Sequence, residues 1–404
     1  MKSKLVALAL FAATAATVAL FPAYQSLGGM TPAGTAAANP PVLNAGMTNQ
    51  SRIDVVFVLD TTGSMGGLIQ AAKEKIWSIA TTLAQAQSAP EIRMGLVAYR
   101  DRGDAYVTRV VDLSSDLDSM YATLMDFQAD GGGDGPESVN QALEDAVSKI
   151  SWSQDKGTYK VVFLVGDAPP HMDYPDDVKY PVTLAAARQQ GIVINAIQCG
   201  QVGSTTPAWQ QIARLGDGHY FQVEQAGSAV AIATPFDEKI ATLSAKLDDT
   251  RLYYGSAEEK EKQRRKTEAT EKLHASSSVA SRARRATFNA SKSGSANFLG
   301  ESELVNDVSS GRVDLSSIDR DELPEPLQVM APEEQAALIS ETAERRNELQ
   351  RQISELSSER SAYLDKKVKE AGGARDSLDD QIYRAVREQA GRLGMSYEAD
   401  APAY

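Results

Sequence analysis

The sequence predicts an α/β fold: a mainly parallel sheet with helices on both faces, followed by a helical C-terminal region. Two features of residues 51–250 support the sheet. Short runs rich in β-branched residues, with Gly or Asp close behind, have the length and composition of buried strands. These runs alternate with longer amphipathic stretches, and this alternation favours parallel pairing because every crossover places a helix on one face of the sheet.

The expected strands are residues 53–59, 92–99, 159–165 and 192–198, with an edge strand at 107–113 and a weaker strand at 219–223. The expected helices are residues 65–86, 117–127, 137–150, 182–190 and about 228–247. The apolar character of the first four strands indicates burial on both faces, as in a sheet between two layers of helices.

Composition divides the chain into several segments. They are a signal peptide or N-terminal anchor at 1–24, a flexible linker at 25–50, the α/β domain at 51–250, a charged and Ser/Ala-rich linker at 251–325, and a helical region at 326–395. The first linker is rich in Gly, Ala, Pro and Asn. The second contains basic clusters around Arg264 and Arg284 that we expect to be solvated.

A heptad-like seam runs through the last region. Its members are Leu349, Ile353, Leu356 and Tyr363, with Arg346 and Arg360 also on it. A repeated apolar seam favours pairing of helices, so self-association through a coiled coil is one expectation. The two arginines weaken the seam, and packing of this helix against the rest of the chain would bury the same residues.

The N-terminus has the pattern of an export signal. Lys2 and Lys4 precede an apolar run from Leu5 to Phe21, which Pro22 ends. We therefore expect the protein outside the cytoplasm, in the periplasm or beyond. It is either free after cleavage or tethered to the inner membrane by the uncleaved run.

Charge, cysteine content and missing motifs exclude several functions. A formal net charge of −13 argues against nucleic acid as the main partner and suits a protein that concentrates cations. With one cysteine, Cys199, the chain has no internal disulfide and no CxxC motif. The sequence contains no Walker A loop, HExxH or Gly-x-Ser-x-Gly elbow, so we expect a binding protein and not an enzyme.

Oxygen-bearing side chains lie in three loops of the expected fold. The candidate ligands are Asp60, Thr62 and Ser64 after the first strand, Asp134 and Glu137 in a glycine-rich turn, and Asp167 after the strand at 159–165. In an open parallel sheet, ligands bind beyond the carboxyl ends of the strands, so we expect these loops to meet. Hard oxygen donors suit a divalent cation. Mg²⁺ is the expected ion, with Mn²⁺ or Ca²⁺ as alternatives.

Each of these loops alone has a purely structural explanation. Asp, Thr and Ser at a strand-to-helix turn often cap the helix, and a glycine-rich turn can serve only as a connection. Their joint occurrence, each at a strand end or a helix start, favours a metal site over caps and turns.

Asp60-x-Thr62-x-Ser64 at the end of the first strand resembles the metal-ion-dependent adhesion site of von Willebrand factor type A domains, and Asp167 matches the family's distal aspartate. The resemblance covers residues 51–250. It implies a Rossmann-like domain of the bacterial exported type, which captures an acidic side chain of a protein partner through the ion. The middle loop departs from the commonest pattern, which supplies a threonine. Asp134-Gly135-Pro136-Glu137 instead resembles the acidic loop of integrin β-chain domains, which leaves open whether Asp134 or Glu137 contacts the ion.

The expected function is therefore metal-dependent adhesion or scaffolding. One alternative is a cell-envelope assembly factor that acts mainly through its helical C-terminal arm. Another is a metal-assisted hydrolase, in which only Glu137 or His171 could serve as general base. His171 itself is expected on a solvated loop, because hard ions prefer oxygen to nitrogen.

Overall fold

The structure is a computed structural model that describes residues 51–133, 135–224, 232–370 and 378–397. The expected export signal, the expected N-terminal linker and the candidate ligand Asp134 lie outside these ranges. None of the helices in the described ranges combines the length and apolar character that crossing a bilayer requires.

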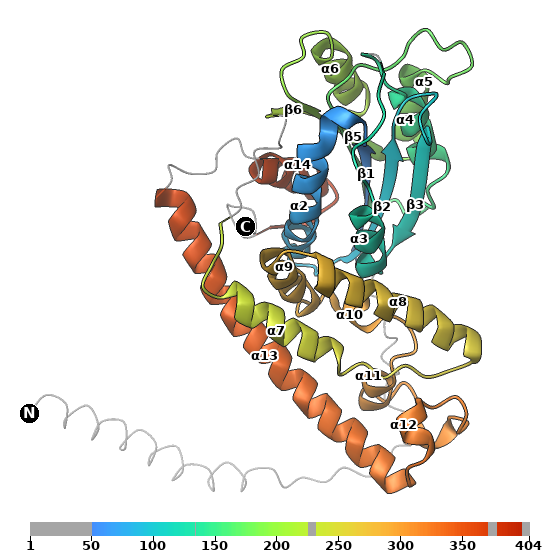
Figure 1. Cartoon of the computed structure of the whole chain (residues 1–404), viewed down its shortest axis with the longest axis vertical. Helices are drawn as coiled ribbons and strands as arrows, with labels where there is room; N and C mark the ends of the chain where they lie inside the picture. Colours follow the sequence, from blue (N-terminus) through green and yellow to red (C-terminus); the bar gives the residue numbers. More distant parts are fainter. Residues whose placement is uncertain (1–50, 134, 225–231, 371–377, 398–404) are drawn as a thin grey trace, which may run out of the picture. The chain divides into compact units, whose positions relative to one another are not determined.

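The described strands form one sheet in the order β3-β2-β1-β4-β5-β6 (Figure 1). They are β1 (Arg52–Asp60), β2 (Glu91–Tyr99), β3 (Thr108–Ser114), β4 (Tyr159–Gly166), β5 (Ile192–Cys199) and β6 (Asp217–Val223). All neighbours pair in parallel except β3, which runs antiparallel to β2. The structure confirms the mainly parallel sheet and its edge strand.

Helices cover both faces of the sheet, as expected. One layer contains α2 (Gly66–Ala84), α3 (Leu117–Met125) and α14 (Leu378–Gly391), and the other contains α4 (Val139–Ser148), α5 (Tyr180–Gln189) and α6 (Thr206–Leu215). Successive residues of β1 pack into the two different layers because side chains alternate along a strand. Val55 and Phe57 belong to the first core, and Val56 and Val58 belong to the second.

Several helix boundaries differ from the expected ones. The helix expected from Glu137 begins at Val139, because Glu137 forms a β-bridge with Pro170. Helix α6 was not among the expected helices. The helix expected at about 228–247 corresponds to α7 (Asp237–Asp248). Residues 228–231 of the expected range lie outside the described residues. Helix α7 begins where the Asp237 side chain accepts a hydrogen bond from the Thr234 amide at 2.8 Å.

Residues 251–325, expected as a flexible linker, form helices instead. These are α8 (Ala257–Ser276), α9 (Val279–Asn289), α10 (Ser295–Leu299), α11 (Leu304–Ser309) and α12 (Glu325–Gln328). Local signals start them: Ser256 and Glu259 form a capping box before α8, and the Ser278 side chain accepts a hydrogen bond from the Ser281 amide at the start of α9. The expectation of a linker is therefore wrong.

The basic cluster at Arg284 and Arg285 is buried, contrary to the expected solvated face. Arg285 is 0% exposed, and its guanidinium lies 2.5 Å from Asp118 in α3 and 2.7 Å from Asp248 in α7. Its positive charge is thus matched by two carboxylates from distant parts of the sequence. Arg264 in α8 is exposed, as expected, and pairs with glutamates one turn away.

Helix α13 (Pro332–Glu370) carries the heptad-like seam, and the structure buries this seam within the chain. Leu349 and Ile353 pack against residues of α7, α9 and α10. The seam arginines form buried ion pairs, Arg346 with Glu303 at 2.8 Å and Arg360 with Asp237 at 2.7 Å. The coiled-coil expectation is corrected accordingly, because these residues already contact helices of their own chain.

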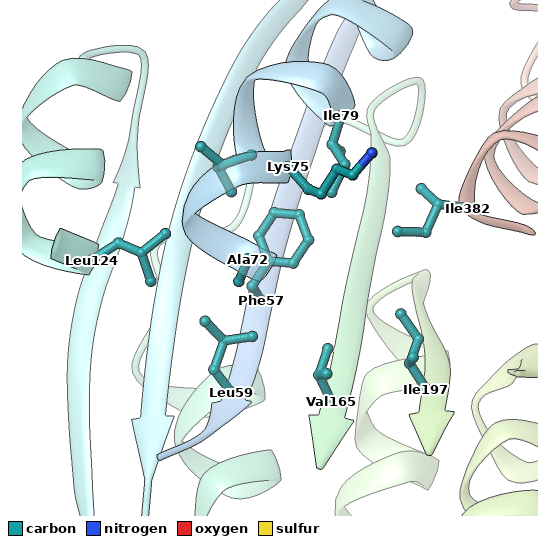
Figure 2. A pocket seen from close by; sticks show the side chains of 10 residues that line it. Phe57, Leu59, Ala72, Lys75, Ile79, Leu124, Val165, Ile197 and Ile382 are labelled. Carbon is teal, nitrogen blue, oxygen red and sulfur yellow. The ribbon is translucent and has the colours of Figure 1, made fainter. Parts of the chain in front are cut away.

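The last helix, α14, returns to the sheet and packs on α2 and β6 (Figure 1). Lys75 of α2 forms a buried ion pair with Asp379 of α14 at 2.6 Å. Gln389 accepts a hydrogen bond from the Tyr159 hydroxyl of β4 and donates one to Asn195 of β5. Figure 2 shows the small apolar cavity of about 40 Å³ beside Lys75, with Phe57, Ile79 and Ile382 in its wall. Helix α14 therefore completes the same layer as α2.

Candidate metal-binding site

Three loops meet at the carboxyl edge of the sheet and are joined by backbone hydrogen bonds. The loop after β1 binds the loop before α4 through Asp130 N to Thr61 O at 3.2 Å and Gly63 N to Gly131 O at 3.1 Å. The loop before α4 binds the loop after β4 through Glu137 N to Pro169 O, at 2.9 Å. These bonds bring together the three segments in which the candidate ligands were expected.

Asp60 is the last residue of β1, and its carboxylate is buried with 1% of the residue exposed. Its Oδ1 accepts hydrogen bonds from the Thr62 amide at 2.9 Å and the Thr62 hydroxyl at 2.6 Å. Its Oδ2 has no hydrogen-bond partner among the described residues. The Thr62 hydroxyl lies 3.4 Å from that of Ser64, so oxygens from all three residues are close together.

Glu137 reaches the same place from the loop before α4. Gly132 separates it from Thr62: a Cβ at this position would lie 3.2 Å from Thr62 Cβ and 3.3 Å from Glu137 Oε1. Gly132 also has φ +78°, a conformation that favours glycine. Glu137 is 4% exposed, and its Oε2 has no hydrogen-bond partner in the described part of the chain.

Asp167 follows β4 directly beside Asp60. A Cβ at the preceding Gly166 would lie 3.1 Å from Asp60 Oδ2, which shows how closely the ends of β4 and β1 approach. Asp167 is 9% exposed, and its carbonyl accepts a hydrogen bond from the Thr205 hydroxyl at 2.8 Å. The start of α6 therefore fixes this loop, although α6 was not expected from the sequence.

Burial and mutual repulsion disfavour the charged forms of these carboxyl groups. Burial raises the pKa of Asp60 to about 7; the charge of Asp167 contributes to the rise, while hydrogen bonds from Thr62 oppose it. Burial, the largest cause, and the charges of Asp60, Asp101 and Asp104 together raise the pKa of Glu137 to about 9. The site lacks positive charge, and a cation would supply it.

The residues present fit a hard divalent cation. The available donors are carboxylate and hydroxyl oxygens, and two buried carboxylate oxygens, Asp60 Oδ2 and Glu137 Oε2, have no hydrogen-bond partner among the residues that the structure describes. No group of three or more His, Cys, Asp or Glu side chains within the described ranges is arranged to hold a metal ion alone. The hydroxyls of Thr62 and Ser64 must therefore contribute to any such site. Asp134, the remaining candidate, lies outside the described residues.

His171 is buried, so the expectation of a solvated loop residue is wrong. The residue is 4% exposed, and its ring stacks on Tyr174 with 4.0 Å between centroids. Its Nδ1 lies 2.7 Å from Asp173 and its Nε2 lies 3.4 Å from Asp101. The imidazole packs beside the candidate site and joins the loop after β4 to the loop after β2.

Sequence reasoning missed residues at the end of β2 and directly after it that also border the site. The Tyr99 hydroxyl is buried without a hydrogen-bond partner in the described chain, next to Gly166 and Asp60. Arg100 donates to Thr61 O at 3.2 Å, and Asp101 accepts from the Ser138 hydroxyl at 2.8 Å. The rule that ligands bind at strand ends would have found these residues if applied to the strand at 92–99.

Comparison with known proteins points to one domain family. A sequence model of the family described as "von Willebrand factor A domain" matches residues 54–234. The rat protein "von Willebrand factor A domain-containing protein 7" is 38% identical over 116 residues, which are 28% of this chain and 12% of that protein. "Alpha-protein kinase vwkA" of Dictyostelium discoideum is 29% identical over 121 residues, which are 30% of this chain and 19% of that protein. The chain thus spans less than a fifth of these relatives.

Solved structures with a similar fold include the VWA domain of SpRpn10, with a TM-score of 0.33 and 14% identity over 43% of this chain and 88% of that chain. Proximal thread matrix protein 1 from the mussel byssus, solved "with zinc occupied MIDAS motif", has a TM-score of 0.33 and 19% identity, and the match covers 43% of this chain and 42% of that chain.

The family match and the observed fold identify the class. Residues 54–234 form a von Willebrand factor A domain, a member of a family of protein-interaction domains. In this chain the domain is followed by helices α8 to α13, and α14 then packs on its sheet.

Proposed function

We propose that this protein binds a protein partner outside the cytoplasm by means of a divalent cation, with Mg²⁺ as the expected ion. The residues that would hold the ion are Asp60, Thr62, Ser64, Glu137 and Asp167, with Asp134 as a further candidate. The observation that carries the proposal is the pair of buried carboxylate oxygens, Asp60 Oδ2 and Glu137 Oε2, that have no partner in the described chain. Leaving such groups unpaired costs free energy, which a bound cation would recover.

The side chains around this site suit binding of an acidic partner. Thr62 and Ser64 are neutral, so they contribute oxygen without cancelling positive charge. When bound, the ion supplies positive charge that a carboxylate of the partner can complement. The pKa of Glu137 near 9 means that this residue holds a proton at neutral pH in the metal-free protein. Glu137 must release that proton to contact the ion as a carboxylate.

We propose a binding role and not catalysis. The sequence lacks the hydrolase motifs named above. His171, one of the two candidate general bases, has its ring packed against Tyr174 and hydrogen-bonded to Asp173, so it is held in a structural contact. Export rests on Lys2, Lys4 and the apolar run that follows them.

Affinity capture from an envelope extract tests the proposal. The full-length protein is immobilised in Mg²⁺, washed, and eluted with a chelator. The proposal predicts a partner that the chelator releases from the parent and that the Asp60→Ala variant does not retain. The matched control is Asp365→Ala, which removes an exposed carboxylate on α13 and should capture the partner normally. Equal capture in the chelator would instead favour contact through the helical arm.

A further inference from the structure

A second cavity opens on the same edge of the sheet, beside the candidate metal loop. It has a volume of about 440 Å³ and is lined by residues of three segments: Arg100 after β2, Tyr106 and Arg109 at the start of β3, and Gln128 and Asp130 before α4. Thr61, which lies between Asp60 and Thr62, donates or accepts a hydrogen bond at 2.7 Å with the Tyr106 hydroxyl. The cavity wall at Tyr106 is therefore hydrogen-bonded to the residue that lies between two would-be ligands.

Arg100 forms a fixed positive wall of this cavity. Its side chain is 6% exposed. Its Nε donates to Thr61 O at 3.2 Å and its Nη2 donates to Gln128 O at 2.9 Å. Its Nη1 lies 3.6 Å from Asp130 Oδ2, beyond normal hydrogen-bond distance. Two neutral carbonyls therefore hold the guanidinium in place, and the exposed Asp130 carboxylate forms a loose ion pair with it.

Arg109 supplies a second guanidinium that forms no ion pair with any described residue. Its Cζ lies 4.2 Å from the centre of the Tyr106 ring, and that of Arg100 lies 4.7 Å from the same ring. Guanidinium groups that lie over an aromatic ring keep their N–H edges available for a carboxylate. Because Tyr106 positions both groups, the cavity presents two oriented donors.

The acidic residues of the cavity do not cancel this charge. Asp126 pairs with Lys272 at 2.6 Å, and the exposed Asp130 is shared with Arg100. Counting Arg100, Arg109 and Lys272 against Asp126 and Asp130 leaves one positive charge in excess. In a chain of net charge −13, an unmatched arginine beside the candidate metal loop indicates recognition of an anion.

We infer that this cavity binds a second acidic side chain of the same protein partner, close in its sequence to the one held by the ion. The inference rests on the proposed metal-dependent binding. A carboxylate meeting the Tyr106-stacked guanidinium of Arg109 forms charge-assisted hydrogen bonds, and the nearby Arg100 adds favourable charge. The preferred partner segment therefore carries two Asp or Glu residues, within about four positions of each other given the reach of an extended chain.

Peptide selection tests this inference. A random peptide library displayed on phage is selected on the full-length protein in Mg²⁺, and bound phage are eluted with a chelator. The eluted peptides should contain two acidic residues at a constant spacing. A synthetic peptide of the selected sequence, and one with its second acid replaced by the amide, are then titrated by fluorescence polarisation against the parent, Arg109→Ala and Arg188→Ala. Arg188 is a matched control, since it is exposed and lies at the end of α5 beside Asp217.

The Arg109→Ala variant should bind the two-acid peptide about five- to tenfold more weakly and the amide peptide as the parent does, while Arg188→Ala changes neither. If Arg109→Ala weakens the binding of both peptides equally, or of neither, the inference of a second acidic side chain is overturned. If the chelator still releases the peptides from the parent protein in that case, the proposed metal-dependent binding stands. If the chelator releases no peptide from the parent protein, both the second-acid inference and the proposed metal-dependent binding are overturned.

Discussion

At the scale of single residues, the candidate site consists of acidic side chains placed where their charge is disfavoured. Asp60 ends a buried strand, and Glu137 lies under a glycine-rich loop. A site that binds no cation would gain stability from neutral side chains here, because buried unpaired charges are costly. The arrangement is therefore understandable as a binding site whose electrostatic strain a ligand relieves.

Glu137→Gln tests this strain through pH. In the metal-free protein the pKa of Glu137 is raised from its ordinary value of 4.5 to about 9, so the folded state keeps a proton that the unfolded chain has released. The stabilisation of the folded state by this proton is complete below about pH 4.5 and is lost as the pH rises toward about 9. Relative to the parent, the Gln variant should be about equally stable at pH 4 and more stable at pH 9, by up to about 6 kcal/mol at about 1.36 kcal/mol per pKa unit.

Urea unfolding of both proteins in a chelator, at several pH values, measures the difference. Glu144→Gln on α4 serves as the control, and its effect should not grow with pH in this way. A Glu137→Gln variant that loses its advantage as pH rises would contradict the assigned direction. Mg²⁺ affinity of the parent should rise over the same range, because protons compete with the ion for Asp60 and Glu137.

Much of the candidate site is predictable at this scale. Asp60, Thr62 and Asp167 follow strands, and parallel strands bring their carboxyl ends to one edge whatever the details of packing. The burial of His171 depends on stacking against Tyr174, which follows from the path of an irregular loop. No periodicity encodes such a path, so sequence reasoning placed this histidine in solvent.

At the scale of elements, the helices α8 and α9 show why charged composition misleads. Arg285 bonds to Asp118, a residue 167 positions away, and to Asp248. Although burial opposes the charged form of Asp118, the charge of Arg285 and its hydrogen bonds lower the pKa of that carboxyl well below its usual range. A partner so distant in sequence leaves no local pattern, so the segment resembled a solvated linker.

Arg285→Ala should destabilise the protein severely. The variant leaves the buried Asp118 without its ion-pair partner, while Asp248 keeps Arg251 and His274, and breaking a buried pair in this way costs about 3–5 kcal/mol. Arg264→Ala on α8 is the matched control: its side chain is 56% exposed, and its loss should leave the stability nearly unchanged. Chemical denaturation compares the two. If Arg285→Ala lowers the free energy of unfolding as little as the control does, α9 is not packed firmly against α3 and α7.

At the scale of the molecule, the candidate site and the helices α8 to α10 lie at opposite edges of the sheet. The site is at the carboxyl ends of the parallel strands. Strand β3 is antiparallel and ends at the other edge, and α3 begins there with Asp116 and Asp118. These two residues bind Lys266 of α8 and Arg285 of α9. The contacts at Asp116 and Asp118 therefore lie away from the candidate site, while Lys272 of α8 reaches Asp126 at the neighbouring cavity.

The arrangement of α13 and α14 was only partly predictable. The expected helices at the end of the chain are present, but the sequence suggested a partner in another copy for the seam of α13. The seam packs against α7, α9 and α10 instead, and Arg346 and Arg360 on it each find a buried carboxylate. Arginines on an apolar seam are consistent with such specific intramolecular pairs, whose partners the seam alone does not reveal.

Calorimetric titration of the full-length protein with Mg²⁺ at pH 8 tests the central claim most directly. The parent should bind about one ion per chain, and Asp60→Ala should give no heat beyond dilution, while Asp365→Ala binds as the parent does. The Asp60→Ala protein should remain folded, with a melting temperature that no longer responds to chelator, because in the metal-free state Asp167 and Glu137 repel this carboxylate and its described hydrogen bonds reach only the neighbouring Thr62. An Asp60→Ala protein that binds Mg²⁺ as tightly as the parent would contradict the account and reduce the loops to caps and turns.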